Sequence, residues 1–364
     1  MMTKETDTPE HYDTVVVGAG PAGVMAAYHA ATRGDVLLLD ASRLPRDKSC
    51  GGMLNEYSQE FLSSFGDMPS SMLLDPHWVN FRYHDWDRGI RKPTQLRFAN
   101  VDRREFDDWL VSLLPANVTV RERVSVTGFT QDSHGVRITA KDPAGEPIQI
   151  DCENLIGCDG PRSTIRRALG AGGVMTYVTL QDFVKLEGEI EPFFDCIYFR
   201  DIGDSFGYAY VVPKGDVAIV GSVFYPKTKR PHEKHDQVLG ILRGSLPFGA
   251  SVKREAWVAL SVRHRRDVVP GQGRVLLAGE AGGFMSPTSG EGISYALNTG
   301  RLAGTAVAQH TPDTALDAYQ SATRSVSTNI VRKLGWLPFM ESRAGKYLAG
   351  FVPTPIVSRV TKGL

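Results

Sequence analysis

The hydrophobic and polar positions near the N-terminus follow first a strand pattern, then a helix pattern, then a strand pattern again. A β-branched apolar run from Thr14 to Val17 meets a glycine-rich turn, an alanine-rich stretch follows, and a second apolar run ends at Asp40. Short apolar runs bounded by turn residues predict buried strands, and the alanine-rich stretch between them predicts a helix. Residues 12–40 are therefore expected to form a strand–helix–strand unit with a glycine-rich turn.

Further strands and helices are expected as far as residue 170. Residues 41–54 are rich in glycine, proline and charge, which predicts a loop, and residues 55–65 predict a helix. Residues 69–98 are turn-rich and aromatic. Two strand-like runs, 118–129 and 136–140, precede a third strand that ends near Cys158. Between these parts, apolar residues at helical spacing predict an amphipathic helix: Phe106, Trp109, Leu110 and Leu113.

The pattern changes between residues 172 and 265, where apolar and aromatic residues alternate. This alternation predicts an antiparallel sheet, interrupted by a polar helix near residues 236–246. A strand from Val275 to Ala278 then leads to a helix over residues 293–308. We therefore expect an α/β (α+β) fold in three parts. A discontinuous nucleotide-binding domain takes residues 10–75, 100–170 and 268–310, a substrate domain takes residues 76–99 and 171–267, and a C-terminal helical segment takes residues 311–364.

The first glycine-rich turn has the spacing of a dinucleotide-binding fingerprint. Gly18 permits the tight turn, Gly20 lets the backbone approach a pyrophosphate, and Gly23 lets helix and strand pack closely. The N–H groups and the dipole of the first helical turn attract phosphates. Asp40, at the end of the second strand, has the place of the acid that binds ribose hydroxyls. Gly290-Glu291-Gly292 supplies a second glycine-rich helix start.

Composition excludes several classes of function. The chain has 364 residues, 42% of them hydrophobic, and its 41 basic and 41 acidic residues balance, so no overall charge attracts nucleic acid. Its four cysteines include no C-x-x-C pair, so we expect no metal site. The N-terminus is polar and no apolar run approaches the ~20 residues that span a bilayer. A cytoplasmic protein with reduced thiols is expected.

Six sequence motifs carry a family resemblance. GAGPAG, CDGPRSTIRR and LLAGEAGGFMSPTSGEGISYAL resemble, in this order, the three FAD-binding signatures of the flavoprotein hydroxylase superfamily. KSCGGML, VDRREFDDWL and GYAYVVPKGD are similar to the geranylgeranyl reductase family, especially its short bacterial branch, which includes the colicin M resistance flavoprotein of enterobacteria. The resemblance spans roughly residues 12–310. It implies a Rossmann-like FAD-binding domain of the hydroxylase type.

The resemblance also implies a set of cofactor contacts. The Ala22 backbone and Asp40 would bind the adenosine half of FAD, and Arg103 would lie near the pyrophosphate or ribityl chain. Glu280, where most of the superfamily has aspartate, would lie near the ribityl hydroxyls, and Ile293 under the flavin pyrimidine. The full expected set is Gly18, Gly20, Ala22, Gly23, Asp40, Cys50, Gly51, Gly52, Arg103, Val124, Asp159, Glu280, Gly290, Gly292 and Ile293.

Two further groups are candidates for chemistry and substrate binding. Gly51 and Gly52 would let the backbone pass flat against a planar group with the thiol of Cys50 beside it, and Cys50 matches the family's cysteine. Cys50 is therefore the candidate catalytic residue, which would shape the pocket or relay a proton, and a buried structural thiol is the alternative. Tyr208 and Tyr210 match the aromatic positions of the family's substrate motif. They are equally typical of a sheet core.

The leading expected function is reduction of carbon–carbon double bonds in a polyprenyl or other isoprenoid lipid by reduced FAD. An FAD-dependent monooxygenase that hydroxylates an aromatic or a quinone precursor is the first alternative. The second is a flavin-dependent halogenase, although its W-x-W-x-I-P motif is absent. The third is a flavin-stabilised binding protein without turnover. No second dinucleotide fingerprint exists, so NADPH and ferredoxin both stay open as the electron donor.

The C-terminal segment from residue 321 to residue 364 is strongly basic. It carries seven bases against one acid, Glu341, which is 7 − 1 = +6 in a chain whose formal net charge is zero. Apolar and aromatic residues lie between the bases: Trp336, Leu337, Phe339, Met340, Tyr347, Leu348 and Phe351. We expect reversible peripheral binding to the anionic inner face of a membrane. Packing of these aromatics on the substrate domain is the alternative.

Overall fold

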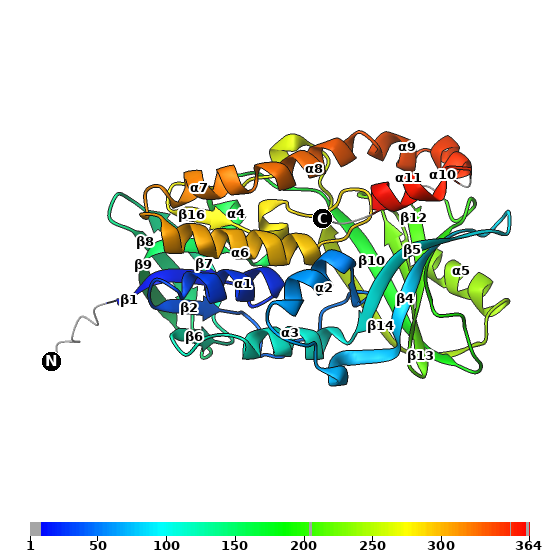
Figure 1. Ribbon diagram of the computed structural model, residues 1–364, viewed down its shortest axis with the longest axis horizontal. Coiled ribbons are helices and arrows are strands. Elements are labelled where there is room, and N and C mark those ends of the chain that lie inside the picture. The colour runs from blue at the N-terminus through cyan, green and yellow to red at the C-terminus, as the bar shows by residue number, and fades with distance from the viewer. Residues whose placement is uncertain (1–8, 204–205, 350, 362–363) are drawn as a thin grey trace.

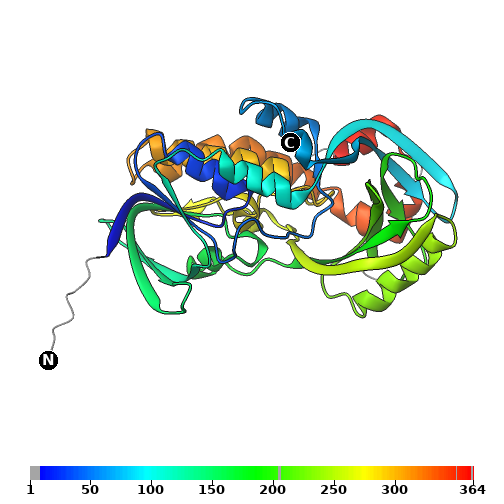
Figure 2. The same ribbon diagram turned by 90° about the horizontal axis from the view of Figure 1, so that it is seen from below.

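The computed structural model describes residues 9–203, 206–349, 351–361 and 364. Two sheets lie side by side along the long axis of the molecule, and helices cover them (Figures 1 and 2). The sheet in the half that holds the N-terminus is built on five parallel strands. In spatial order these are β6 (Val118–Arg121), β2 (Val36–Leu39), β1 (Glu10–Val17), β9 (Pro147–Gly157) and β16 (Val275–Leu277).

Smaller elements complete the first sheet. The antiparallel pair β7 (Ser125–Gln131) and β8 (Val136–Lys141) joins β9 through β8, and β15 (Gly271–Gln272) joins β16. The single strand-like run predicted over residues 118–129 is thus two strands. Residues 122–124 separate them, and Arg123 there adopts a positive φ of 57°. A residue in this left-handed conformation cannot continue a strand, so the chain turns.

Helices α1 (Pro21–Ala30), α3 (Arg103–Ser112) and α6 (Ile293–Gln309) cover one face of the first sheet. Two glycines bring α6 against α1. A Cβ on Gly300 would lie 2.1 Å from the carbonyl oxygen of Ala22, and one on Gly304 would lie 2.3 Å from that of Ala26. The backbones of the two helices are therefore in direct contact. The opposite face is covered by the β7–β8 pair and α4 (Thr164–Ala168).

The second sheet has eight strands in the spatial order β14, β10, β13, β12, β11, β4, β5, β3, and neighbouring strands are antiparallel except for the parallel pair β11–β4. Helix α5 (Pro231–Arg243) packs against this sheet, and it begins earlier than predicted, with Pro231 in its first turn. The strand bounds are β14 (Phe248–Leu260), β10 (Thr176–Leu186), β13 (Val217–Phe224), β12 (Phe206–Lys214), β11 (Phe193–Tyr198), β4 (Leu73–Asp85), β5 (Ile90–Val101) and β3 (Met53–Leu54).

The description of residues 69–98 as turn-rich was wrong, because β4 and β5 form a long hairpin there. Val79, Phe81 and Tyr83 alternate along β4 and are all buried, which is the strand period that the prolines in this region obscured. The ends of this hairpin, and β3, lie in segments that were expected to belong to the first domain. The domain boundaries themselves stay a prediction.

The chain ends in helices, as predicted. These are α7 (Ala315–Ala322), α8 (Arg324–Leu334), α9 (Leu337–Glu341), α10 (Arg343–Ala349) and α11 (Thr354–Thr361). They run from the first sheet to the second, so that α9, α10 and α11 lie over the β-rich half (Figure 1). The remaining helix is α2 (Glu56–Ser63), and short 3-10 helices occur at Ser70–Met72, Gly160–Arg162, Arg265–Asp267 and Gly279–Gly282. None of the helices in the described part of the chain is long and apolar enough to cross a membrane.

Candidate functional site

A cavity of about 640 Å³ lies where the two sheets meet. Its floor is formed at the carboxyl ends of β1, β2 and β9, the edge of a parallel sheet at which nucleotide cofactors bind. Its roof is the second sheet. Of the residues proposed for cofactor, catalysis or substrate, all line this cavity except Gly23 and Gly52. The structure thus brings together residues from position 18 to position 293, although their contact with a cofactor stays a prediction.

The glycine-rich turn has the close approaches that its sequence implied. Gly18 has a φ of 100°, and a Cβ there would lie 2.5 Å from the carbonyl oxygen of Cys158 on the neighbouring strand. A Cβ on Gly23 would lie 1.7 Å from the carbonyl oxygen of Gly18, so Gly23 serves helix packing and does not reach the cavity. Gly20 caps α1 without a side-chain hydrogen bond and faces the cavity. The first-turn N–H groups are therefore available to a phosphate.

Arg46 adds a cation beside the glycine-rich turn and the open end of α1, which together we call the glycine cradle. A Cβ on Gly20 would lie 3.1 Å from the guanidinium of Arg46, whose Nε lies 3.7 Å from Asp40 Oδ2. The open helix end and the guanidinium together fit the diphosphate of a dinucleotide. Sequence reasoning missed Arg46, because it lies in a loop with no periodic pattern. The one available signal was the basic character of Arg46 and Lys48 immediately before the cysteine motif.

Asp40 is buried and holds the turn as well as facing the cavity. Its Oδ2 accepts a hydrogen bond from the Ala19 N–H at 2.8 Å, and its Oδ1 accepts one from the Ser42 N–H at 2.7 Å. Each carboxylate oxygen has a second lone pair, so a ribose hydroxyl still has an acceptor. Asp159 similarly caps α4 by accepting hydrogen bonds from Ser163 Oγ and the Thr164 N–H, at 2.5 and 2.6 Å. Burial raises the pKa of Asp159.

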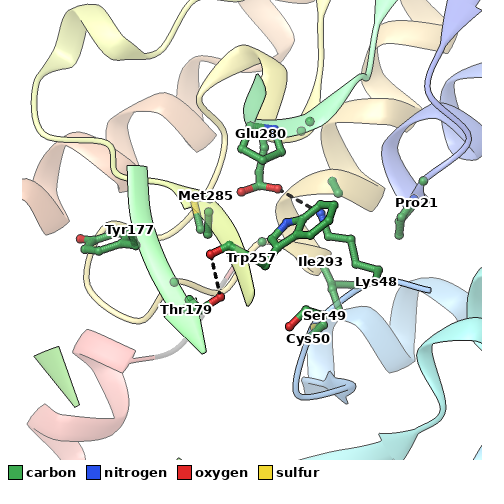
Figure 3. A pocket seen from close by; sticks show the side chains of 18 of the residues that line it. Pro21, Lys48, Ser49, Cys50, Tyr177, Thr179, Trp257, Glu280, Met285 and Ile293 are labelled. Atoms are coloured by element: carbon green, nitrogen blue, oxygen red, sulfur yellow. Dashed lines mark hydrogen bonds and ion pairs between the residues drawn. The ribbon is translucent and has the colours of Figure 1, made fainter. Parts of the chain in front are cut away.

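Glu280 connects the floor of the cavity to its roof. Its Oε1 accepts a hydrogen bond from the Leu260 N–H at 3.1 Å, at the end of β14, and its Oε2 lies 3.5 Å from Lys48 Nζ. The ammonium of Lys48 in turn lies 5.2 Å from the ring centre of Trp257. Figure 3 shows Glu280, Lys48 and Trp257 meeting at one side of the cavity, with Ser49 and Cys50 nearby. Part of the Glu280 hydrogen-bonding capacity is thus used by the protein itself.

Cys50 is half-buried in the cavity wall, and two buried cations lie near it. Arg103 is paired with Asp107, one helical turn further on, whose Oδ1 lies 2.9 Å from the guanidinium. The protein itself thus supplies a carboxylate partner, and the contact of Arg103 with a cofactor stays a prediction. Lys214 donates hydrogen bonds to the carbonyl oxygens of Gly52 at 3.4 Å and Val101 at 3.0 Å. Burial lowers the pKa of Lys214 to about 7.

Gly52 is also confined by the backbone around it. It has a φ of 63°, and a Cβ there would lie 2.2 Å from the carbonyl oxygen of Val101. The Gly52 carbonyl oxygen accepts a hydrogen bond from the Val101 N–H at 2.9 Å, in addition to the one from Lys214. Gly52 therefore fixes the loop behind Cys50, and Gly51 is the glycine of the pair that lines the cavity.

The start of α6 differs from the expectation in one respect. Gly290, Gly292 and Ile293 line the cavity, but the carboxylate of Glu291 between them accepts hydrogen bonds from the N–H and the Oγ of Ser294, at 2.8 and 2.6 Å. One donor of this helix end is therefore already used. Burial raises the pKa of Glu291. The nearby Lys333 of α8 is buried, which lowers its pKa to about 8 although Glu291 favours its charged form.

The roof of the cavity is aromatic. The hydroxyls of Tyr177, Tyr208 and Tyr210 donate hydrogen bonds to Pro287 O, Ser289 O and Gln181 Oε1, at 3.3, 3.1 and 3.0 Å. These bonds tie the polar ends of the rings to the protein, so mainly ring surface is left for a ligand. Further rings from the same sheet line the cavity: Phe194, Tyr198, Tyr225 and Trp257.

A second cavity of about 100 Å³ adjoins the first. Phe194, Tyr198, Tyr208 and Glu291 line both. Of the residues that line only the smaller cavity, Phe81, Leu96, Phe98 and Cys196 on β4, β5 and β11 are apolar or aromatic. The others are polar: Arg97 on β5, and Asn55 and Glu56 at the start of α2. The lining of the two cavities thus extends from the glycine cradle into the second sheet.

Fold and cavity place this chain in the class of nucleotide-cofactor oxidoreductases whose parallel sheet binds the cofactor and whose second sheet covers the reacting group. Residues 11–334 match the family described as the FAD binding domain, and the chain belongs to that family. It is therefore an FAD-dependent oxidoreductase. The predicted FAD-binding fold of the hydroxylase type is confirmed.

The chain is also similar to individual known proteins. Protein CbrA from Escherichia coli O9:H4 (strain HS) is 29% identical over 332 residues, which cover 89% of each chain. Among solved structures, a geranylgeranyl bacteriochlorophyll reductase-like protein from Thermoplasma acidophilum is similar with a TM-score of 0.78 at 18% identity, over 98% of this chain and 92% of that chain. The flavin-dependent halogenase CmlS is similar with a TM-score of 0.73 at 19% identity, over 93% and 67%. At such identities the two structures establish the shared fold.

Proposed function

We propose that this chain uses reduced FAD to saturate carbon–carbon double bonds of a polyprenyl or other isoprenoid lipid. The observation that carries the proposal is the mainly apolar and aromatic lining of the two adjoining cavities, which extends from the glycine cradle into the second sheet. Most of the exposed lining of the smaller cavity is apolar, with side chains from Phe81, Leu96, Phe98 and Phe194, and the polar groups of Asn55, Glu56 and Arg97 also border it. A chain-like apolar molecule gains free energy by filling such a space, and it displaces the water that would compete for a hydride.

Residues of this chain would hold FAD along the cavity floor. Gly20 and Arg46 suit its diphosphate, Asp40 its adenosine ribose and Glu280 its ribityl hydroxyls, while the start of α6 at Ile293 would lie under the ring. The bound and reduced cofactor supplies a hydride. A double bond that accepts a hydride at one carbon needs a proton at the other. Cys50 is the proposed proton relay, because it lines the cavity and is only half-buried.

Two measurements test this proposal. Purified protein should be yellow and release FAD on denaturation. Lipid extracts from cells with and without the protein, compared by mass spectrometry, should then differ by products that are heavier by two hydrogens for each reduced bond. Identical lipid profiles, together with no oxidation of reduced flavin by isoprenoid lipids in vitro, would refute the reductase proposal.

The similarity in fold to CmlS keeps oxygen-dependent chemistry as the second candidate. Oxygen uptake separates the two. A reductase oxidises its reduced flavin in step with substrate under strict anaerobiosis, whereas a monooxygenase or halogenase consumes one oxygen molecule per product. The same anaerobic assay identifies the electron donor when NADPH and reduced ferredoxin are supplied in turn.

A further inference from the structure

Exposed apolar side chains gather in the C-terminal segment. Among the described residues, nine large hydrophobic side chains are exposed, and five of them lie between positions 336 and 356. These five are 43–60% exposed: Trp336, Tyr347, Leu348, Phe351 and Ile356. Single exposed apolar residues need no explanation, but a concentration of aromatic residues in one segment marks an interaction surface.

Two of these aromatics are joined by bases from distant parts of the chain. The rings of Tyr347 and Phe351 lie 6.0 Å apart, and the guanidinium of Arg88 lies 4.6 and 4.3 Å from their centres. Arg200 lies 5.3 Å from the Tyr347 ring, and Lys92 donates a hydrogen bond to the carbonyl oxygen of Val352 at 3.0 Å. We name Tyr347, Leu348, Phe351, Arg88 and Arg200 the aromatic–basic surface. The hairpin β4–β5 thus contributes to a surface that the sequence assigned to the C-terminus alone.

Acidic side chains partly offset the cations of the aromatic–basic surface. Around the aromatic–basic surface, Arg88, Lys92 and Arg200 face two acids, Asp85 and Asp87, which leaves 3 − 2 = +1. The segment 321–364 adds its seven bases and one acid.

The structure changes the surface charge expected for residues 321–364 in two ways. Lys333 is buried and is lost to the surface, and the acid Glu341 is neutralised by Arg263, with oxygen–nitrogen distances of 2.6 and 3.0 Å. The side chains of Arg343, Lys346 and Arg359, and the whole of Lys362, lie outside the described part of the chain. Two further bases of the segment, Arg324 and Arg332 of α8, are exposed.

The same segment also forms part of the cavity wall. Leu337 and Met340 of α9 line the main cavity, and Trp336, immediately before them, is exposed. The bidentate pair between Glu341 and Arg263 holds the end of α9 in place. In Figure 1, α9 leads directly into α10, which carries Tyr347. The cavity is therefore separated from the outer face of this segment by a single short helix.

We propose that the aromatic–basic surface binds the surface of an anionic lipid bilayer. Aromatic residues stabilise a protein at the boundary between headgroups and acyl chains, and neighbouring arginines and lysines attract anionic lipids. Bilayer contact at this surface places α9 and the cavity next to the membrane, so an apolar substrate reaches the cavity without crossing water. This last step rests on the function proposed above, whereas the binding itself does not.

The test uses full-length, FAD-loaded protein and sedimentation with large unilamellar vesicles. One set contains equal amounts of phosphatidylglycerol and phosphatidylcholine, and the other contains phosphatidylcholine alone. We expect binding to the anionic vesicles that weakens at high salt, and little binding to the neutral ones. The double variant Tyr347→Ser/Phe351→Ser should bind about tenfold more weakly, because it loses the apolar part of the contact. Val252→Ser is the matched control, since Val252 is 58% exposed on β14 and lies outside this surface.

Several results would overturn the proposal. Absence of sedimentation with anionic vesicles is one, and equal binding by the double variant and the wild type is another. Light scattering tests the alternative that a second copy of the chain occupies this surface. If the wild type is a dimer that does not bind vesicles, and the double variant is a monomer, the surface is a contact between two copies of the chain. FAD content and the unfolding midpoint of each variant show whether it has folded. Vesicle binding without any lipid reduction would refute the proposed function and leave this surface assigned.

Discussion

The buried ammonium of Lys214 gives the most quantitative prediction. The pKa of this group is lowered from 10.5 to about 7, chiefly by burial. Between these two values the unfolded chain binds a proton that the folded chain does not, so unfolding takes up a proton and stability rises with pH. Below about pH 7 both states are protonated, and the cost of burying the charge is fully present.

The magnitude follows from the size of the shift. Each pH unit inside the window contributes at most about 1.4 kcal/mol, and the half-titrated folded group near pH 7 reduces the total, so stability should rise by about 2 kcal/mol between pH 7 and pH 9. Lys214→Met removes this contribution. The unfolding free energy of the wild type should therefore rise by that amount relative to that of Lys214→Met over the same interval. The Gly52 carbonyl keeps its hydrogen bond from the Val101 N–H, so the loop behind Cys50 retains one of its attachments.

Urea unfolding followed by circular dichroism at several pH values, with excess FAD, measures this difference. Lys185→Met is a suitable control, because Lys185 lies in the same sheet with an exposed side chain. Parallel stability curves for wild type and Lys214→Met across the interval would refute the reasoning, since they would mean that the buried ammonium keeps its proton at pH 9.

Two other substitutions test the cavity. Glu280→Ala should weaken FAD binding by about 1–3 kcal/mol, and it should also destabilise the FAD-free protein because the Leu260 N–H loses its acceptor. Titration calorimetry measures the first effect and thermal unfolding of the FAD-free protein the second. Unchanged affinity for FAD would remove Glu280 from the cofactor site. Cys50→Ser should retain FAD and lose most of its turnover if the thiol relays a proton, since a serine hydroxyl is a far weaker acid; equal turnover in wild type and variant would make Cys50 a structural thiol.

The part of the fold that sequence predicted is the part encoded locally. The strand, the turn with Gly18 and Gly20, the helix and Asp40 follow one another within 30 residues, and each has a signal that depends only on its neighbours. The hairpin of β4 and β5 was missed because its period-2 pattern appears only after Pro76 and is interrupted again by turn residues near Gly89. Such a pattern resembles an irregular segment until a partner strand is known.

The candidate site likewise contains residues that local sequence predicts and residues that only tertiary contacts bring together. The glycines and Asp40 were assigned from spacing, whereas Arg46, Lys214 and Glu291 acquire their positions only when distant segments meet. Nothing in the sequence distinguishes the buried Lys333 from the exposed Arg332 beside it except the helical period of α8. Burial by tertiary contact decides which charges belong to the site, and single-sequence reasoning does not have access to it.

The backbone contact between α1 and α6 sets the distance between the two ends of the proposed cofactor site. In the FAD placement proposed above, the open end of α1 would hold the diphosphate and the start of α6 would lie under the ring. Gly300 and Gly304 leave no side chain between these two helices. The separation of the two ends of the cofactor site is therefore a fixed length set by main-chain atoms. A methyl group added at either glycine would push the helices apart and displace the ring end relative to the diphosphate end. Gly300 and Gly304 therefore set the spacing of the two helix ends, although neither glycine lies at the proposed site of reaction.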